Sequence, residues 1–356
     1  MLKNGRGFST AKSLLTVERP RVYYLELEGP KVYYIKKDEL LSIPELDFDL
    51  IITGNRTAEV LGNEVAKVYG AEILSLKPDE RDFWHLNDLD LKPKSIAAVG
   101  GGSISDYAKV LADVTGAKLT IIPTALSNDG YASDRSSLRN NGIKGTYKTR
   151  GPDVIIGIKE VLEDSCVDCL NIGGWGDHLS KYSSLSDWKL AAKKGKEKFD
   201  QKIFSEVEAS LDFPGNTKDL FYHIINSGKV AQRFGSSRPL SGGEHAIYHA
   251  LSNSRNYEKE HGRQVAAFGL FVLGAYELAG LEPIIKWQDY QNKMKALGLP
   301  MTLKGLEVNY SEFEAAVMKA PTARKKERYG VLDYMKAQGV LTPTYIRSVS
   351  ETVGLI

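Results

Sequence analysis

The chain has 356 residues, of which 42% are hydrophobic and 26% are charged, and its formal net charge at pH 7 is +2. This length predicts two domains, and the near balance of acidic and basic residues excludes the strongly basic surface of a nucleic-acid-binding protein. No apolar run approaches the roughly eighteen residues of a membrane span, and residues 1–18 lack the apolar stretch of a secretory signal, so we expect a cytoplasmic protein. The basic start of the chain also resembles an organelle transit peptide, which is the alternative.

The first 158 residues alternate between strand and helix patterns. Short apolar or β-branched runs bounded by turn formers predict strands at 21–28, 31–36, 49–53, 71–76, 95–99, 118–122 and 153–158. Helical spacing or length predicts helices between several of them, at 37–42, 60–68 and 107–114. Residues 136–150 predict a hairpin, with Asn140-Asn141-Gly142 at its turn. The alternation predicts a parallel sheet with helices on both faces.

The second half of the chain shows only helical periodicity. Apolar residues recur at spacings of three and four over 177–208, 217–234, 264–278 and 311–318. We therefore predict an α/β domain over residues 1–158 that binds a dinucleotide. An all-helical domain over residues 159–356 is expected to follow it.

A run of glycines joins the predicted strand at 95–99 to a helix. Gly100-Gly101-Gly102 is expected to turn with positive φ and to let a ligand approach, while Ser103 is placed to cap the helix. Such a helix start attracts phosphate. The spacing is not the G-x-G-x-x-G fingerprint, so a simple turn is the alternative. The hydroxyl-rich loop at 123–133 follows the next strand and belongs at the carboxyl edge of the sheet, where open α/β folds bind ligands.

Three polar segments of the helical half combine histidine or aspartate with glycine. Residues 173–182, 237–251 and 261–264 are each expected to open a helix, and they carry Asp177, His245 and His261. One carboxylate and two imidazoles match the ligands of a catalytic zinc ion with one open position. The alternative is that these histidines are surface or hydrogen-bonded core residues, because their separations are not diagnostic by themselves.

The only two cysteines, Cys166 and Cys169, form a C-x-x-C motif. This spacing occurs in redox pairs and in half of a zinc knuckle, but no second C-x-x-C completes such a knuckle. Two small buried side chains are the alternative that we prefer.

Taken together, the motifs resemble the sn-glycerol-1-phosphate dehydrogenases, which share a superfamily with iron-containing alcohol dehydrogenases, glycerol dehydrogenase and dehydroquinate synthase. The resemblance runs in order from about residue 50 to Arg328-Tyr329-Gly330-Val331-Leu332. The motifs that carry it are Gly100-Gly101-Gly102-Ser103-x-x-Asp106, Pro123-Thr124-x-x-Ser127-x-Asp129-Gly130-x-x-Ser133, Gly176-Asp177-x-x-Ser180, Asp187-Trp188-Lys189-Leu190-Ala191, Ser237-Arg238-Pro239-x-Ser241-Gly242-x-Glu244-His245 and His261-Gly262-x-Gln264. It implies an N-terminal Rossmann-like domain with a parallel sheet and an all-helical C-terminal domain, as in dehydroquinate synthase.

The resemblance also implies roles for individual residues. Asp177, His245 and His261 would hold one zinc ion per subunit, and Asp129 and His249 would contact the substrate. Lys181 stands where iron-type relatives carry a further histidine, so we add it to the catalytic set as an ammonium that helps to neutralise a substrate phosphate. The residues implied to bind the cofactor are Gly101, Gly102, Ser103, Ile104, Ser105, Asp106, Thr124, Ala125, Leu126, Ser127 and Ser133.

The activity that follows from the resemblance is reduction of dihydroxyacetone phosphate to sn-glycerol 1-phosphate, a step towards glycerophospholipid backbones. The cofactor is NAD(H) or NADP(H), because Gly54-Asn55-Arg56 offers no carboxylate that would reject a 2′-phosphate. A cyclase like dehydroquinate synthase, or a dehydrogenase for another phosphorylated or cyclic ketone, is the alternative. The expected partners are a small phosphorylated substrate and further copies of the chain in a homo-oligomer.

Overall fold

The computed structural model describes residues 29–43, 46–77, 91–140, 143–164, 168–211, 215–254, 261–323 and 328–356. The predicted strand at 21–28, Cys166 and the side chain of Cys169 lie outside this description. No helix within these ranges is long and apolar enough to cross a membrane.

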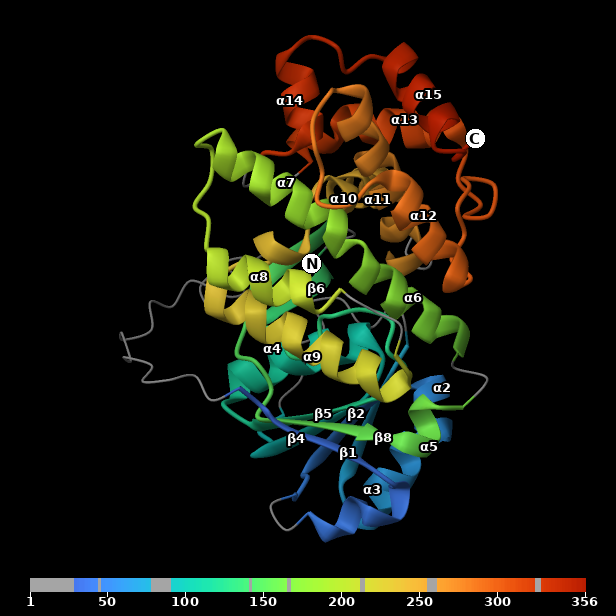
Figure 1. Cartoon of the computed structure of the whole chain (residues 1–356). Coiled ribbons are helices and arrows are strands. Elements are labelled where there is room, and N and C mark those ends of the chain that lie inside the picture. The colour runs from blue at the N-terminus through green and yellow to red at the C-terminus, as the bar shows by residue number, and fades with distance from the viewer. Residues whose placement is uncertain are drawn as a thin grey trace, which may run out of the picture. The chain divides into compact units, whose positions relative to one another are not determined.

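A six-stranded parallel sheet forms the centre of the N-terminal part of the chain (Figure 1). Its order is β1 (Lys31–Ile35), β8 (Val154–Ile158), β5 (Lys118–Pro123), β4 (Ser95–Gly100), β2 (Leu50–Gly54) and β3 (Glu72–Leu76). The three strands β2, β4 and β5 are almost wholly buried, which explains why they read as continuous apolar runs. The register pairs Gly100 with Pro123, so β4 and β5 end side by side at the carboxyl edge.

Helical elements join β1 to β2, β2 to β3 and β4 to β5, as the alternation predicts. A 3-10 turn (η1, Lys37–Ser42) follows β1, and α2 (Asn55–Thr57), a π-helical stretch (η2, Ala58–Gly62) and α3 (Asn63–Tyr69) join β2 to β3. The long helix α4 (Gly102–Thr115) joins β4 to β5. A separate antiparallel hairpin, β6 (Arg135–Asn140) and β7 (Ile143–Lys148), packs on α4 through β6.

The start of α4 differs from two details of the prediction. Gly101 occupies the N-cap with φ −80°, and Ser103 is the second residue of the helix, so the expected serine cap is wrong. None of the three glycines has positive φ. Gly100 is required for a different reason, because a Cβ there would lie 2.9 Å from the side chain of Ile104.

Two compact units make up the chain. One consists of Met1–Thr124 and Asp134–Ile158, and the other of Ala125–Ser133 and Lys159–Ile356. The loop at Ala125–Ser133 therefore belongs with the helices, although it directly follows β5. That the first unit is the dinucleotide-binding domain and the second the catalytic domain remains a prediction.

Within its described residues, the second unit consists of helices joined by loops and has no strand. The buried helix α11 (His261–Leu278) lies at its centre and contacts α6 (Asp168–Leu179), α7 (Lys181–Lys193), α10 (Gly243–Ser254), α12 (Trp287–Ala296), α14 (Val331–Ala337) and α15 (Pro343–Thr352). Because α11 is apolar on all sides from Val265 to Ala275, it can only be stable when surrounded. The remaining elements are α5 (Lys159–Leu162), α8 (Gln201–Ala209), α9 (Thr217–Phe234), η5 (Arg238–Leu240), α13 (Tyr310–Lys319) and η6 (Ala320–Thr322).

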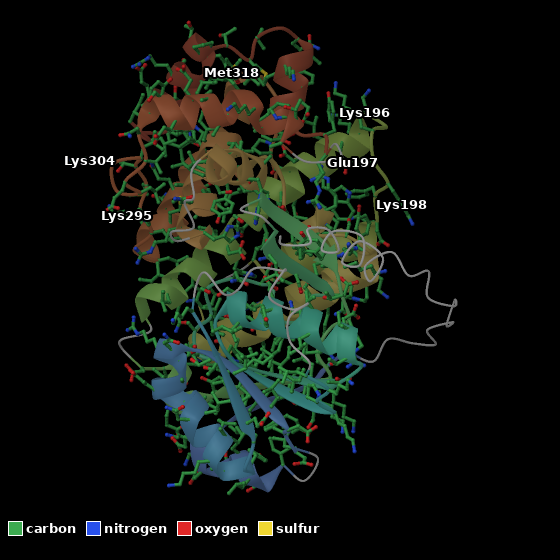
Figure 2. All side chains as sticks on the ribbon, turned by 180° about the vertical axis from the view of Figure 1, so that it is seen from behind. Lys196, Glu197, Lys198, Lys295, Lys304 and Met318 are labelled. Atoms are coloured by element: carbon green, nitrogen blue, oxygen red, sulfur yellow. The ribbon has the colours of Figure 1, made fainter. Side chains whose placement is uncertain are left out.

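The periodicity over 177–208 predicts one helical stretch, which the structure divides among α6, α7 and α8. Polar contacts fix the connection between α7 and α8. Glu197, labelled in Figure 2, accepts hydrogen bonds from Arg238 Nε and, at 2.6 Å, from the N–H of Tyr329. This carboxylate therefore ties the α7–α8 connection to η5 and to the segment before α14.

Candidate metal centre and nucleotide-binding turn

Helices α6 and α11 approach each other at glycines. A Cβ on Gly262 would lie 1.7 Å from the carbonyl oxygen of Gly173, and a Cβ on Gly176 would lie 2.5 Å from the carbonyl oxygen of Gly262. A third glycine, Gly174, packs on the carbonyl oxygen of Leu126 in the loop, where a Cβ would lie 1.8 Å away. No larger residue fits at these positions, so the glycines bring the end of α6, the start of α11 and the loop together.

The position of Asp177 corrects the prediction that residues 173–182 open a helix. Asp177 lies near the C-terminal end of α6, whereas His245 and His261 do lie at the starts of α10 and α11. A carboxylate is unfavourable at the negative end of a helix dipole. Burial also raises the pKa of Asp177, but the nearby imidazoles of His245 and His261 and the charge of Lys181 hold it well below its ordinary value. The carboxylate is therefore ionised and surrounded by groups of opposite charge.

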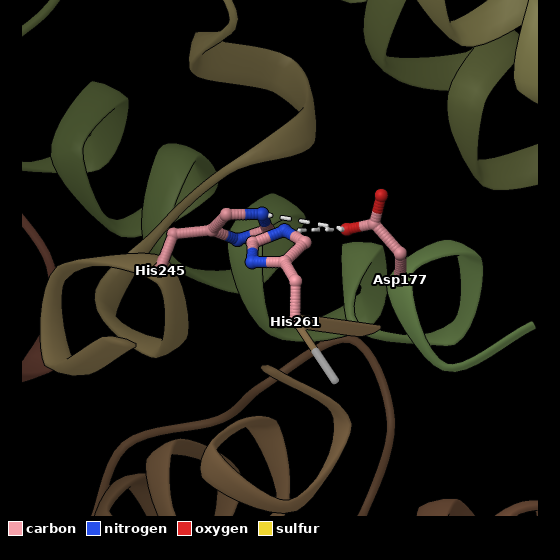
Figure 3. Close-up of side chains that lie close together, drawn as sticks. All are labelled: Asp177, His245 and His261. Atoms are coloured by element: carbon pink, nitrogen blue, oxygen red, sulfur yellow. Dashed lines mark ion pairs between the residues drawn. The ribbon is translucent and has the colours of Figure 1, made fainter. Parts of the chain in front are cut away.

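The three predicted ligands meet (Figure 3). Asp177 Oδ1 lies 3.4 Å from His245 Nε2 and 3.6 Å from His261 Nε2, and one candidate ligand atom of each residue lies within 4.8 Å of the others. Two ligand atoms of a tetrahedral zinc ion, each bound at about 2.0 Å, are about 3.3 Å apart. Asp177 Oδ1 is buried and has no hydrogen-bond partner of its own, whereas Oδ2 accepts the N–H of Asp129 at 3.1 Å. A buried acceptor oxygen in this state suits a cation, and one carboxylate with two imidazoles suits zinc.

A buried glutamate that the motifs contain, but to which the sequence assigns no role, lies behind His245. Glu244 Oε1 is 2.7 Å from His245 Nδ1, on the opposite side of the ring from Asp177. Burial lowers the pKa of His245, but the Asp177 and Glu244 carboxylates raise it above its ordinary value. The only signal in the sequence is a glutamate immediately before the histidine.

Two residues predicted to act on the substrate lie beside the cluster. Lys181, which is only 1% exposed, places Nζ 3.3 Å from Asp129 Oδ2 and 3.3 Å from the carbonyl oxygen of Asp177. Burial and the Asp177 charge raise the pKa of Asp129, although Lys181 opposes them. The ammonium therefore compensates a carboxylate that would otherwise be destabilised beside Asp177.

The third predicted catalytic residue, His249, is half-buried and lies one helical turn after His245 on α10. Its ring centroid is 5.6 Å from that of Tyr248, and the Tyr248 ring is 4.4 Å from that of His261. An aromatic side chain thus links His249 to the cluster.

Some of the predicted cofactor-binding residues lie at the start of α4, where either peptide N–H groups or side chains could contact a cofactor. Nothing lies within 4 Å of the position of a Cβ on Gly101, so the start of α4 is open to a ligand. The side chains of Ile104 and Ser105 are buried. Asp106 is also engaged, since Oδ1 pairs with Lys109 Nζ at 3.2 Å and Oδ2 accepts the N–H of Ser137 at 3.1 Å. At this turn the peptide N–H groups, rather than these side chains, have the chemistry to bind a pyrophosphate.

The other cofactor candidates follow β5. Thr124 donates its N–H to the carbonyl oxygen of Gly100 at 3.2 Å, which joins it to the glycine turn within the first unit. In the second unit, Ala125 and Leu126 are buried, and the N–H of Leu126 donates to Asn171 Oδ1 at 2.9 Å. Ser127 is half-buried and Ser133 is buried.

Comparison with known proteins agrees with this architecture. The profile of the iron-containing alcohol dehydrogenase family matches residues 35–163. A glycerol-1-phosphate dehydrogenase [NAD(P)+] of Metallosphaera sedula is 28% identical over 335 residues, which are 89% of this chain and 92% of the relative. The enzyme of the same name from Pyrococcus horikoshii is 29% identical over 311 residues, or 80% of this chain and 85% of the relative. Over most of its length the chain is thus similar to glycerol-1-phosphate dehydrogenases.

These relatives are dehydrogenases by name, and this chain is an oxidoreductase. Among solved structures, a probable glycerol dehydrogenase from Sinorhizobium meliloti superposes with a TM-score of 0.63 at 18% identity, covering 90% of this chain and 98% of the other. That likeness confirms the predicted fold class, a parallel-sheet α/β part followed by a helical part.

Proposed function

We propose that this protein reduces dihydroxyacetone phosphate to sn-glycerol 1-phosphate, with NADH or NADPH as the hydride donor and one zinc ion per subunit. The observation that carries the proposal is the buried Asp177 Oδ1, which has no hydrogen-bond partner and lies 3.4 and 3.6 Å from two imidazole nitrogens. The relatives named glycerol-1-phosphate dehydrogenase [NAD(P)+] support the reaction and the cofactor. The cyclase considered as an alternative gains no support from them.

Asp177, His245 and His261 would hold the zinc ion. When bound, the metal supplies a Lewis acid for the ketone oxygen, worth several kcal/mol of charge stabilisation, and the reduced nicotinamide supplies the hydride. Asp177 Oδ2 meanwhile accepts the N–H of Asp129, which fixes the loop that carries Asp129 relative to the ligand set. The same aspartate would thus bind the metal and position a substrate-binding residue.

Asp129 and Lys181 would bind and orient the substrate. The Lys181 ammonium is buried next to the Asp129 carboxylate, in a setting where charge interactions are stronger than in water. We expect Asp129 to accept a substrate hydroxyl and Lys181 to offset the negative charge of the substrate phosphate.

His249 would supply the proton that the new alcohol needs. Its imidazole belongs to the one side-chain type that ordinarily titrates near neutral pH, and it follows His245 by one turn on the same face of α10. The open start of α4 would bind the cofactor pyrophosphate through peptide N–H groups.

The test is a steady-state assay of zinc-reconstituted protein with dihydroxyacetone phosphate and each nicotinamide cofactor, followed by chiral analysis of the glycerol phosphate. We expect continuous oxidation of the cofactor and the sn-1 product. In Asp177→Asn, the zinc content should fall below about 0.1 ion per subunit, since a proposed metal ligand is lost. The activity should fall by about a thousandfold. Asp200→Asn is the matched control, because asparagine caps α8 as well as aspartate does.

Zinc-loaded protein that oxidises neither cofactor with this substrate would overturn the proposed reaction. We also propose that the chain forms a homo-oligomer, as the resemblance implies, and light scattering of the purified protein measures this directly.

A further inference from the structure

The imidazole of His245 lies between two carboxylates. Its Nε2 faces Asp177 Oδ1 at 3.4 Å, and its Nδ1 lies 2.7 Å from Glu244 Oε1. Glu244 is 0% exposed, so it cannot take its hydrogen bonds from bulk water. A buried carboxylate of this kind is costly unless all of its oxygens find donors.

Donors surround both oxygens of Glu244. Oε1 also accepts the N–H of Gly242 at 2.6 Å, and Oε2 lies 2.7 Å from the hydroxyl of Ser183 on α7. A peptide N–H can only donate, so the Oε1 atom that the Gly242 N–H contacts is an acceptor oxygen.

The consequence concerns the tautomer of His245. Because Glu244 Oε1 can only accept, Nδ1 must carry the hydrogen of this contact. In the neutral ring the lone pair then lies on Nε2, which is the nitrogen that faces Asp177 and His261. This is the form of histidine that binds a metal.

Helix α7 holds Glu244 in place through residues four apart on one face. Ser183 contacts Glu244 Oε2, and Asp187 Oδ2 accepts the N–H of Gly243 at 2.8 Å. Gly242 permits this approach, because a Cβ there would lie 2.8 Å from Ser184 Cα and 3.0 Å from Glu244 Oε2. The position of the glutamate is thus determined by packing of α10 on α7 and not by the histidine alone.

We propose that Glu244 is a positioning residue that fixes the tautomer and the ring orientation of His245, so that Nε2 is presented to a divalent metal together with Asp177 and His261. The proposal rests on the metal site of the proposed function. Carboxylates in this position fix the ring orientation and raise the basicity of metal-binding histidines, and their loss weakens metal affinity by about 10- to 100-fold.

A purely structural role for Glu244 makes a different prediction, which Asp187 allows us to test. Asp187 is also a buried carboxylate that anchors the start of α10, but it accepts its hydrogen bonds from Gly243, Tyr276 and Val331 rather than from a histidine. Asp187→Asn is therefore the matched control for loss of a buried charge at the same helix start.

The experiment titrates metal-free Glu244→Gln, Glu244→Ala, Asp187→Asn and wild-type protein with zinc against a chromophoric chelator. We expect the zinc Kd to rise about tenfold in Glu244→Gln, whose amide oxygen can still accept from Nδ1, and about a hundredfold in Glu244→Ala. Asp187→Asn should lower Tm but change the Kd less than twofold. The visible spectrum of the cobalt-substituted protein should change in the two Glu244 variants only.

A second readout needs no metal. In ¹⁵N-histidine NMR of the metal-free wild type, at a pH where the ring is neutral, the His245 signal, assigned with His245→Gln, should be that of the Nδ1–H tautomer, and Glu244→Ala should shift it. The Nε2–H tautomer in the wild type, unchanged zinc affinity in both Glu244 variants, or an equal loss of affinity in Asp187→Asn would each overturn the inference and leave the proposed function intact. Wild-type protein that binds no zinc would overturn the proposed metal site and, with it, the role given to Glu244.

Discussion

Helices α4 and α10 each begin at a glycine that directly follows another glycine, Gly101 before α4 and Gly242 before α10, and the surroundings of these two preceding glycines differ. At the start of α4, nothing lies within 4 Å of where a Cβ on Gly101 would be. At the start of α10, a Cβ on Gly242 would lie 2.8 Å from Ser184 Cα and 2.9 Å from Asp187 Oδ2. Glycines before a helix therefore have two physical causes, room for a ligand in the first case and close packing of the chain on itself in the second.

The difference extends to the positive ends of the two helices. At α10 the N–H groups of Gly242 and Gly243 donate to the carboxylates of Glu244 and Asp187, so the chain supplies its own anions. At α4 no acidic residue lies in the first turn, which leaves this end suited to an anion from outside. One start carries the proposed metal ligand His245, and the other is suited to a phosphate.

Alanine substitution of Gly101 and of Gly242 distinguishes room for a ligand from close packing. The larger effect on stability is expected at Gly242. Gly242→Ala should destabilise the protein by about 2 kcal/mol, because the new methyl group meets the backbone of α7. Gly101→Ala should change the free energy of unfolding by less than about 0.5 kcal/mol, since φ is −80° and the space is open. The same methyl group should raise the KM for the nicotinamide cofactor about tenfold.

Urea unfolding and cofactor kinetics of the two variants measure these effects. Equal stability losses, or an unchanged cofactor KM in Gly101→Ala, would remove the distinction between the two helix starts.

Asp187, which accepts the N–H of Gly243 at the start of α10, should also make the free energy of unfolding depend on pH. Burial and the nearby Glu244 raise the pKa of Asp187 from 3.8 to about 7, although Arg238 and two peptide N–H groups oppose this. Between these two values the folded protein holds a proton that the unfolded chain releases. The resulting stability is fully present below about pH 4 and is lost as the pH rises through 7, by at most about 1.4 kcal/mol per pH unit.

Asp187→Asn removes this titration. Urea unfolding at pH 5.5, 6.5, 7.5 and 8.5 should show wild-type stability falling relative to the variant across the first three values and then levelling off. Parallel pH profiles would show that Asp187 stays ionised in the folded protein.

The fold was predictable because each strand and helix carries its own local pattern. The α9 prediction at 217–234 matches Thr217–Phe234, for example. The glycines at 173–176 led to the wrong prediction that a helix begins there. Gly174 and Gly176 are instead required by contacts that are distant in the sequence, with the carbonyl oxygens of Leu126 and Gly262. His178 shows the same limit of sequence patterns. It also follows these glycines, but its Nε2 lies 2.9 Å from the Ser210 carbonyl oxygen and so contacts the main chain. The role of Glu244 depends on a ring orientation that no spacing encodes.

Substitution of Lys181 tests the charge balance beside the ligand set. Lys181→Ala and Lys181→Met both remove an ammonium 3.3 Å from Asp129, and the methionine keeps most of the volume of this 1% exposed side chain. Both should raise the KM for dihydroxyacetone phosphate about tenfold, whereas the KM for unphosphorylated dihydroxyacetone should change less. Steady-state kinetics with the two ketones provides the comparison, and an unchanged KM for the phosphorylated ketone would eliminate the proposed role of the ammonium.

The smallest expected effect concerns the choice of cofactor at the open helix start. Arg56 is exposed just after the carboxyl end of β2, the strand that pairs with β4, and no carboxylate occupies Gly54-Asn55-Arg56. An arginine in this place suits a 2′-phosphate, and an acid there would repel it and accept the 2′-hydroxyl of NADH instead. Arg56→Glu should therefore lower kcat/KM with NADPH about fivefold and leave that with NADH within twofold. Lys118→Glu makes the same change of charge at an exposed residue on the opposite edge of the sheet, at the start of β5, so a similar loss in this variant would assign the effect to net charge rather than to the position of Arg56.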